Sequence, residues 1–177
     1  KKKKCLDIGI KCNIIKLNKD IKQSEILKLI NNLNIDAKIN GIIVQLPIPN
    51  HLNENVILKS INIKKDVDGF HPFSTGSLIT NNINYISATP LGILKIIDNY
   101  NIETKGKSIT IIGKSKIVGT PLSLLLSNEN IYAGTVTLCD KYTENLNNYL
   151  KNADIIIVAA GVHHLINKKM SIKENCT

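Results

Sequence analysis

The stretch KSITIIGKSKIVG, residues 107–119, decides which fold this chain can adopt. Its part 108–112 is a short apolar run rich in β-branched residues, the pattern of a strand buried inside a parallel sheet. Gly113 ends that run, and Gly119 precedes the apolar, helix-like run 121–126. Strand, glycine turn and helix together present backbone N–H groups to a phosphate. The spacing G-x-S-x-x-x-G departs from the common dinucleotide fingerprint, so the turn alone leaves a nucleotide site and an ordinary tight connection both open.

The chain around this turn predicts a parallel α/β sheet. Residues 135–139 and 154–159 are expected to form two further strands, with a helix over 144–151 between them. Thr89 followed by Pro90 predicts a helix start before the first strand, with Thr89 as its N-cap. The second half of the chain therefore has the order β-α-β-α-β, which requires parallel strands joined by right-handed crossovers.

The first half carries weaker signals. Gly9 is expected to close a helix, the run 10–17 to form a strand, and Ser24 to cap a second helix. The apolar run 41–47 predicts a buried strand whose only polar side chain is Gln45. A buried amide is costly unless it is paired. Gln45 is thus either a satisfied structural group or a ligand-facing residue at the carboxyl end of a strand.

A loop with two acids follows in KKDVDGF, residues 64–70. Asp66 and Asp68 stand one residue apart and are followed by Gly69, which predicts a tight loop. One acid could cap this turn or pair with a lysine, which is a purely structural role. From the residues alone, that role and ligand binding are both open.

Composition narrows the functional classes. Aromatic residues make up only 4% of the chain and hydrophobic residues 43%, so its core must be built mainly of Ile, Leu and Val. The net charge of +9 fits nucleic acid, a membrane surface or an anionic small molecule. Apart from residues 1–4, the lysines are scattered and no aromatic residues are interleaved with them. We therefore expect a lysine-rich surface and an anionic cofactor, but neither a nucleic-acid partner nor a membrane partner.

The cysteines and histidines predict no metal site. Cys5, Cys12, Cys139 and Cys176 form no C-x-x-C pair, and none lies at zinc-ligand spacing from the His163–His164 pair. They are interpreted as reduced thiols of an intracellular, reducing compartment, either cytoplasm or organelle. No apolar run approaches the length needed to cross a membrane.

Five stretches of the chain resemble, in order and spacing, the signature segments of the bifunctional methylenetetrahydrofolate dehydrogenase/cyclohydrolase (FolD) family. They are GIIVQLPIP (41–49), KDVDGFHP (65–72), TPLG (89–92), GKSKIVGTP (113–121) and DIIIVAAG (154–161). The resemblance implies an α/β protein with an N-terminal α/β folate-binding and catalytic domain, a C-terminal Rossmann-like parallel-sheet domain, and a cleft between them. The polar run 81–84 suggests a boundary that gives domains 1–86 and 87–177. Both domains are expected to be truncated, because the chain starts without Met and the family's closing Gly/Pro-rich segment is not found.

The resemblance also implies an activity. The family oxidises 5,10-methylenetetrahydrofolate to the methenyl form with NADP or NAD, and then hydrolyses that cation to 10-formyltetrahydrofolate. These steps belong to one-carbon metabolism and purine biosynthesis, and the family implies a homodimer. Two alternatives are an inactive paralogue or fragment of the family and another Rossmann oxidoreductase of the shikimate-dehydrogenase type. The latter has no reason to carry VQLP and DVDG before the nucleotide turn.

The resemblance places catalysis and folate binding in the first half. Alignment without gaps puts the family's catalytic lysine at Lys1, although four consecutive lysines also fit a solvated helix surface. Gln45 is expected to hydrogen-bond Lys1 and orient it, while Asp68 binds the pterin ring through two N–H groups. Val44 and Leu46 are expected to line the folate site. The other acid of the Asp68 loop is interpreted as structural.

For the dinucleotide, Gly113, Lys114 and Ser115 match the family's G-R-S segment, with lysine replacing arginine. Thr89 and Val118 are predicted cofactor contacts by the same resemblance. Lysine keeps the positive charge of arginine but loses its planar fork.

The residues that follow the second predicted strand point in two directions. The family commonly has C-H-S or C-H-R there, whereas this chain has Cys139, Asp140 and Lys141. Asp140 favours the free ribose hydroxyls of NAD, and Lys141 can reach the 2′-phosphate of NADP. Weighing both, the sequence favours NADP, with NAD as the alternative.

Overall fold

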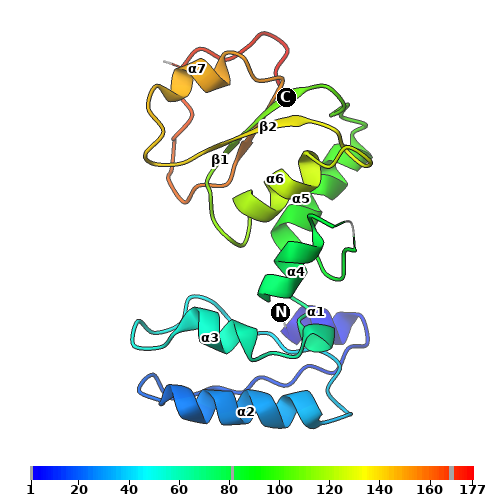
Figure 1. Ribbon diagram of the computed structural model, residues 1–177, viewed down its shortest axis with the longest axis vertical. Helices are drawn as coiled ribbons and strands as arrows, with labels where there is room; N and C mark the ends of the chain where they lie inside the picture. The colour runs from blue at the N-terminus through cyan, green and yellow to red at the C-terminus, as the bar shows by residue number, and fades with distance from the viewer. Residues whose placement is uncertain (1, 81, 168–169) are drawn as a thin grey trace.

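A computed structural model describes residues 2–80, 82–167 and 170–177 of the chain (Figure 1). The described part of the first half forms helices without an extended strand ladder. These are α1 (Lys2–Asp7), α2 (Gln23–Ile35), α3 (Glu54–Lys59), the 3₁₀ helix η1 (Ile63–Lys65) and α4 (Pro72–Ser77). The second half alternates helices and strands. These are α5 (Ala88–Asn99), β1 (Ser108–Ile112), α6 (Gly119–Leu126), β2 (Thr135–Cys139), α7 (Leu146–Leu150) and β3 (Ile155–Val158).

The second half is a parallel sheet with the strand order β2-β1-β3, as the sequence predicted. The register pairs Ile112 of β1 with Cys139 on one side and with Val158 on the other. The carboxyl ends of all three strands therefore meet at one edge, where parallel sheets bind their ligands.

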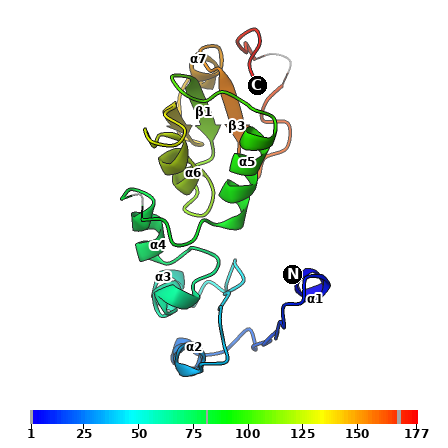
Figure 2. The ribbon, with the colours of Figure 1, turned by 90° about the vertical axis from the view of Figure 1, so that its right-hand side faces the viewer.

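Helices cover both faces of this sheet (Figures 1 and 2). Ile109 and Ile111 of β1 are fully buried among side chains of α5 and α6, including Leu94 and Leu122. The intervening residues point to the other face, where Ile112 packs with Leu150 of α7. This alternation explains why the run 108–112 is apolar almost throughout: both faces of β1 are covered.

The first half has a separate core and lies at the other end of the molecule's long axis, with α4 between the two halves (Figures 1 and 2). Ile26 and Ile30 of α2 pack against Ile57 and Leu58 of α3. The i, i+4 spacing of the two isoleucines gives α2 the apolar face that the sequence predicted.

The two strands predicted in the first half are wrong. Among the described residues, the segments 10–17 and 41–47 form only one isolated bridge, between Ile42 and Asp66. A strand needs a neighbouring backbone along its whole length, and apolar alternation cannot supply one. Ile14 remains largely exposed in consequence, and so does Gln45, which the sequence placed in a buried strand.

Two predicted helix caps are also wrong. Lys22 rather than Ser24 precedes α2, and Ser87 rather than Thr89 precedes α5. Neither residue caps its helix through its side chain. Lysine has no acceptor atom, and the Ser87 hydroxyl donates to Ile117 O instead. The closure of α1 by Gly9 is confirmed, with a φ of 75° at the glycine and a 2.8 Å hydrogen bond from the N–H of the next residue to Cys5 O.

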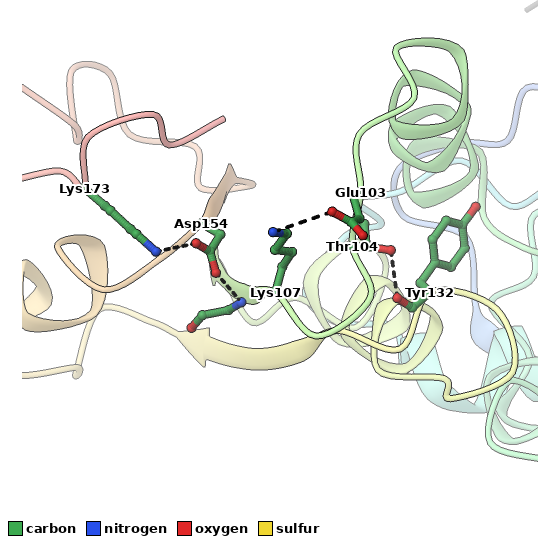
Figure 3. Close-up of polar contacts among 7 residues, drawn as sticks. Glu103, Thr104, Lys107, Tyr132, Asp154 and Lys173 are labelled. Carbon is green, nitrogen blue, oxygen red and sulfur yellow. Dashed lines mark hydrogen bonds and ion pairs between the residues drawn. The ribbon is translucent and has the colours of Figure 1, made fainter.

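A hydrogen bond and an ion pair of Asp154 connect the amino ends of β1 and β3 (Figure 3). Asp154 Oδ2 accepts a hydrogen bond from Ser108 N at 2.8 Å, and its other oxygen pairs with Lys173 Nζ. Nearby, Thr104 Oγ1 donates to Tyr132 O at 2.7 Å. These contacts secure the edge opposite the ligand-binding one.

Candidate functional site

The turn between β1 and α6 is closed by two glycines that pack against backbone atoms. Gly113 has a φ of 119°, where side chains are strained, and a Cβ there would overlap the Ala159 carbonyl that follows β3. A Cβ at Gly119 would overlap the Gly113 carbonyl. The first turn of α6 thus lies directly against the end of β1, which any side chain at position 119 would prevent.

The loop between these glycines is fixed by hydrogen bonds. Ser115 Oγ accepts from Val118 N at 3.1 Å, and Ser115 O accepts from Thr120 N at 3.0 Å. The buried Ser87 donates its hydroxyl to Ile117 O at 2.8 Å. The loop therefore sits in one conformation at the amino end of α6, where backbone N–H groups and the helix dipole attract an anion.

The carboxyl end of β2 adds an acid beside this turn. Gly113 N donates to Cys139 O at 2.8 Å, so the ends of β1 and β2 adjoin. Asp140 Oδ2 lies 3.4 Å from Lys114 Nζ. The hydrogen bond from Tyr142 N to Asp140 Oδ1, 3.0 Å long, lowers the pKa of Asp140, and Lys114 lowers it further. This carboxylate is therefore ionised at neutral pH.

The other predicted dinucleotide residues lie close by in the fold. Lys141 is exposed, and its Nζ lies 4.8 Å from the centroid of the Tyr142 ring, a cation–π contact. Thr89 is exposed in the first turn of α5, two residues after Ser87. The structure thus gathers the glycine turn and Asp140 at one sheet edge, but it directs Lys141 onto a ring.

In the first half, the segment 41–46 and the loop 65–69 run side by side. Ile42 N donates to Lys65 O at 2.8 Å, next to the parallel bridge between Ile42 and Asp66. The predicted Gln45 and Asp68 follow the two bridged residues by three and two positions along the chain.

The predicted folate residues differ in their surroundings. Gln45 is exposed and donates from Nε2 to Leu46 O at 2.9 Å, while Val44 and Leu46 are half-buried against the core of the first half. Asp68 is half-buried. The predicted hydrogen bond between Gln45 and Lys1 stays a prediction, because Lys1 lies outside the described residues.

Asp66 has the structural role that the sequence gave it. It is 1% exposed, and its carboxylate accepts hydrogen bonds from Phe70 N at 3.3 Å, His71 N at 2.9 Å and Ser74 Oγ at 2.7 Å. A carboxylate with three such donors fixes the loop that carries Asp68.

One residue links the loop of Asp68 to the glycine turn. Gly69 has a φ of 70°, and a Cβ there would be 3.0 Å from Tyr85 O and 3.2 Å from Ser87 N. Ser87 in turn binds Ile117 O in the glycine turn. Ser87 is not among the residues predicted from the sequence, where its only signal is a hydroxyl just before the helix start at A-T-P.

The surface near this junction is hollowed. A depression of about 440 Å³ lies between the loop of Asp68 and the start of α5. Its lining is mainly apolar: Val67, Ile83, Asn84, Tyr85, Ile86, Ala88 and Leu91.

Two other kinds of feature are absent from the part of the chain that the structure describes. No group of three or more His, Cys, Asp or Glu side chains there could hold a metal ion. No helix among the described residues is long and apolar enough to cross a membrane.

Two protein-family models match the chain in succession. The model of the tetrahydrofolate dehydrogenase/cyclohydrolase catalytic domain matches residues 1–68. The model of the NAD(P)-binding domain of the same enzymes matches residues 87–177.

Known proteins resemble the chain along nearly all of its length. "Bifunctional protein FolD" of Brevibacillus brevis is 43% identical over 169 residues, which are 96% of this chain and 58% of that protein. The crystal structure of the bifunctional enzyme FolD from Campylobacter jejuni is 44% identical with a TM-score of 0.90, over 96% of this chain and 60% of that one. A 5,10-methylenetetrahydrofolate dehydrogenase from the silkworm Bombyx mori is 35% identical with a TM-score of 0.91, over 97% and 62%. The chain thus spans about three fifths of the length of these relatives.

Proposed function

The chain belongs to the tetrahydrofolate dehydrogenase/cyclohydrolase family, and from this membership we propose that it oxidises 5,10-methylenetetrahydrofolate to the methenyl form with a nicotinamide dinucleotide and hydrolyses the product to 10-formyltetrahydrofolate. One observation carries the proposal: Ser87 and Gly69 join the loop of Asp68 to the glycine turn. Each half supplies a different kind of group to this junction, an acid and a phosphate-binding turn.

The second half has the groups to hold the dinucleotide, which acts as hydride acceptor when bound. The close approach of Gly113 and Gly119 leaves backbone N–H groups of the loop, including that of Ser115, at the positive end of α6 for the pyrophosphate. Val118, whose N–H is bonded to Ser115 Oγ, is proposed as a contact through its other atoms. Asp140 lies where the adenosine ribose binds in folds of this type. Thr89, in the first turn of α5, is proposed as a further contact.

The first half is proposed to bind folate and to move protons. Loss of a hydride from the methylene carbon leaves a delocalised cation, so that step needs no strong base. Hydrolysis then needs a water at the methenyl carbon and a group that takes its proton, and we assign this role to Lys1. Gln45 orients Lys1, and Asp68 accepts two N–H groups from the pterin ring. Val44 and Leu46 line the ring site.

Further parts of the proposal rest on the sequence and the family. They are a boundary between residues 86 and 87, assembly into a homodimer, and work in a reducing compartment. Leu78, in the short stretch after α4, already packs into the core of the second half, so the two halves share residues near that boundary. Light scattering on the purified protein gives the number of chains directly.

The finer question is which dinucleotide is used. The sequence favours NADP because Lys141 can reach a 2′-phosphate, whereas Lys114 replaces the family's arginine without its planar fork. The choice of dinucleotide depends on where these two side chains lie. Their contacts favour NAD.

Two absorbance assays test the function. The protein carrying residues 1–177 should form 5,10-methenyltetrahydrofolate when NAD or NADP is added to 5,10-methylenetetrahydrofolate, and it should speed the loss of added methenyl compound. Lys1→Gln should abolish the second activity, whereas Lys3→Gln, a matched change in the same lysine run, should leave both. Loss of both activities in the unchanged protein, or retained hydrolysis in Lys1→Gln, would contradict the respective assignment.

A further inference from the structure

Both lysines that could receive the 2′-phosphate of NADP already have partners. Lys114 Nζ lies 3.4 Å from Asp140 Oδ2, and Lys141 Nζ lies 4.8 Å from the centre of the Tyr142 ring. The ion pair of Lys114 and Asp140 has no net charge. The positive charge of Lys114, which the sequence made available to a phosphate, is therefore neutralised by Asp140.

Asp140 is held in place by its own loop, independently of Lys114. Its backbone N–H donates to Thr143 Oγ1 at 2.8 Å, and its Oδ1 accepts from Tyr142 N at 3.0 Å and from Thr143 Oγ1 at 3.4 Å. The Tyr142 hydrogen bond also keeps the pKa of this carboxyl low. If Lys114 swings away to meet a phosphate, an oriented negative charge remains at the end of β2.

We propose that Asp140 makes this protein selective for NAD over NADP. This inference rests on the proposed function. Oδ1 is occupied by the loop, so Oδ2 is the oxygen left to accept hydrogen bonds from the ribose hydroxyls, with Lys114 alongside. A 2′-phosphate in the same place would put about two negative charges beside the carboxylate, and such like-charge contacts are strongly unfavourable in a binding site.

Lys114 also contributes to the proposed preference for NAD. It is half-exposed and paired with Asp140 by a single contact, so it neutralises the acid without forming the bidentate phosphate contact that arginine would make. Once Asp140 loses its charge, Lys114 is free to bind a phosphate. Replacing the Asp140 carboxylate by an uncharged amide should therefore shift the preference from NAD toward NADP.

Calorimetric titration with NAD and with NADP tests the proposal. The unchanged protein should bind NAD at least about tenfold more tightly than NADP. Asp140→Asn, which keeps the side-chain shape, should shift the ratio of the two dissociation constants toward NADP by about tenfold or more, and added salt should weaken the gained affinity. Lys114→Met in the Asp140→Asn background should remove that gain.

Two control variants separate this effect from a general change of charge. Glu103→Gln alters net charge as Asp140→Asn does, but Glu103 pairs with Lys107 at the opposite end of β1, so the ratio should not change. Lys116→Met removes a lysine from the same loop as Lys114 and should also leave the ratio unchanged. Tighter binding of NADP by the unchanged protein, or an unchanged ratio in Asp140→Asn, would overturn the inference and leave the proposed reaction standing. Binding of neither dinucleotide at millimolar concentration would overturn the proposed function itself.

Discussion

Gly113 and Gly119 set how closely β1, α6 and the end of β3 approach one another. The obstacle to a side chain at position 119 is a backbone carbonyl, which cannot rotate away as a flexible side chain would. Gly119→Ala should therefore lower the free energy of unfolding by about 3 kcal/mol or more, in the range of overpacking and backbone displacement.

The matched control for that variant is Gly92→Ala. Gly92 lies inside α5 and has no atoms within 4 Å of an added Cβ, so alanine should stabilise the protein by about 0.5–1 kcal/mol. Urea denaturation of both variants measures the difference. Equal effects would show that the approach at Gly119 is looser than described.

Asp154 gives the protein an acid-sensitive contact (Figure 3). Lys173, and then the N–H of Ser108, lower the pKa of this carboxyl below its ordinary value. In the unfolded chain the pKa is higher, so the contribution to stability is complete at neutral pH and is lost as the pH falls through the folded value. Asp154→Asn should thus be less stable than the unchanged protein at pH 7, and the two should converge as the pH falls below the lowered pKa of the folded state.

Thermal melts at several pH values measure this. Lys173→Met is the graded comparison, because it removes the largest cause of the shift and keeps the Ser108 hydrogen bond. A gap between Asp154→Asn and the unchanged protein that stays constant down to acid pH would contradict the assignment.

Single residues were predictable where the chemistry is local. Gly9 closes α1 because the helix end itself requires a left-handed residue. Of the two acids in DVDG, Asp66 was correctly predicted to be structural. The pairing of Lys114 with Asp140 could not be foreseen, because the two residues meet only through the register of β1 and β2. Lys141 contacts the ring of its own sequence neighbour Tyr142, and which way its flexible side chain turns does not follow from the sequence.

The sheet and its covering helices carry most of the packing in the second half. Leu122 of α6 is 0% exposed, whereas Ile131 in the following loop is 54% exposed. Leu122→Ala should cost about 2–5 kcal/mol through lost burial and a cavity, and Ile131→Ala should stay within about 0.5 kcal/mol of the unchanged protein. The urea midpoints of the two variants give the comparison, and similar midpoints would contradict the described core.

Strands were predictable where both faces of the strand are buried and the neighbouring strands come from the same half of the chain. β1 and β2 appear at the expected residues because their apolar runs end at a glycine and at an acid. The segments 10–17 and 41–47 have strand-like composition, yet only the single bridge at Ile42 forms among the described residues. Composition reports a preference for extended backbone, whereas a strand also requires a partner.

The two halves are joined through Ser87, which is 5% exposed and anchors the glycine turn from the start of α5. Ser87→Ala removes this anchor and should weaken dinucleotide binding several-fold while costing only about 1 kcal/mol of stability. Ser127→Ala is the control, because its hydroxyl bonds within its own neighbourhood to Leu124 O. Calorimetric titration with NAD compares the variants, and equal affinities would show that the anchor has no effect on the turn.

The arrangement of the whole chain was predictable only through the resemblance of five separate stretches. No rule of local pattern brings DVDG and the glycine turn together, since the contacts that do so run through Gly69 and Ser87. The hydrophobic pattern predicted the parallel sheet, and the resemblance to the family predicted that its carboxyl edge binds a dinucleotide.

Direct hydride transfer tests most closely whether folate and dinucleotide meet at this junction. The protein is supplied with 5,10-methylenetetrahydrofolate carrying two deuterium atoms on the methylene carbon, together with NAD, and the reduced dinucleotide is analysed by mass spectrometry. We predict one deuterium in each reduced nicotinamide, formed in step with the methenyl product. Reduced nicotinamide without deuterium, or none at all, would contradict the shared site.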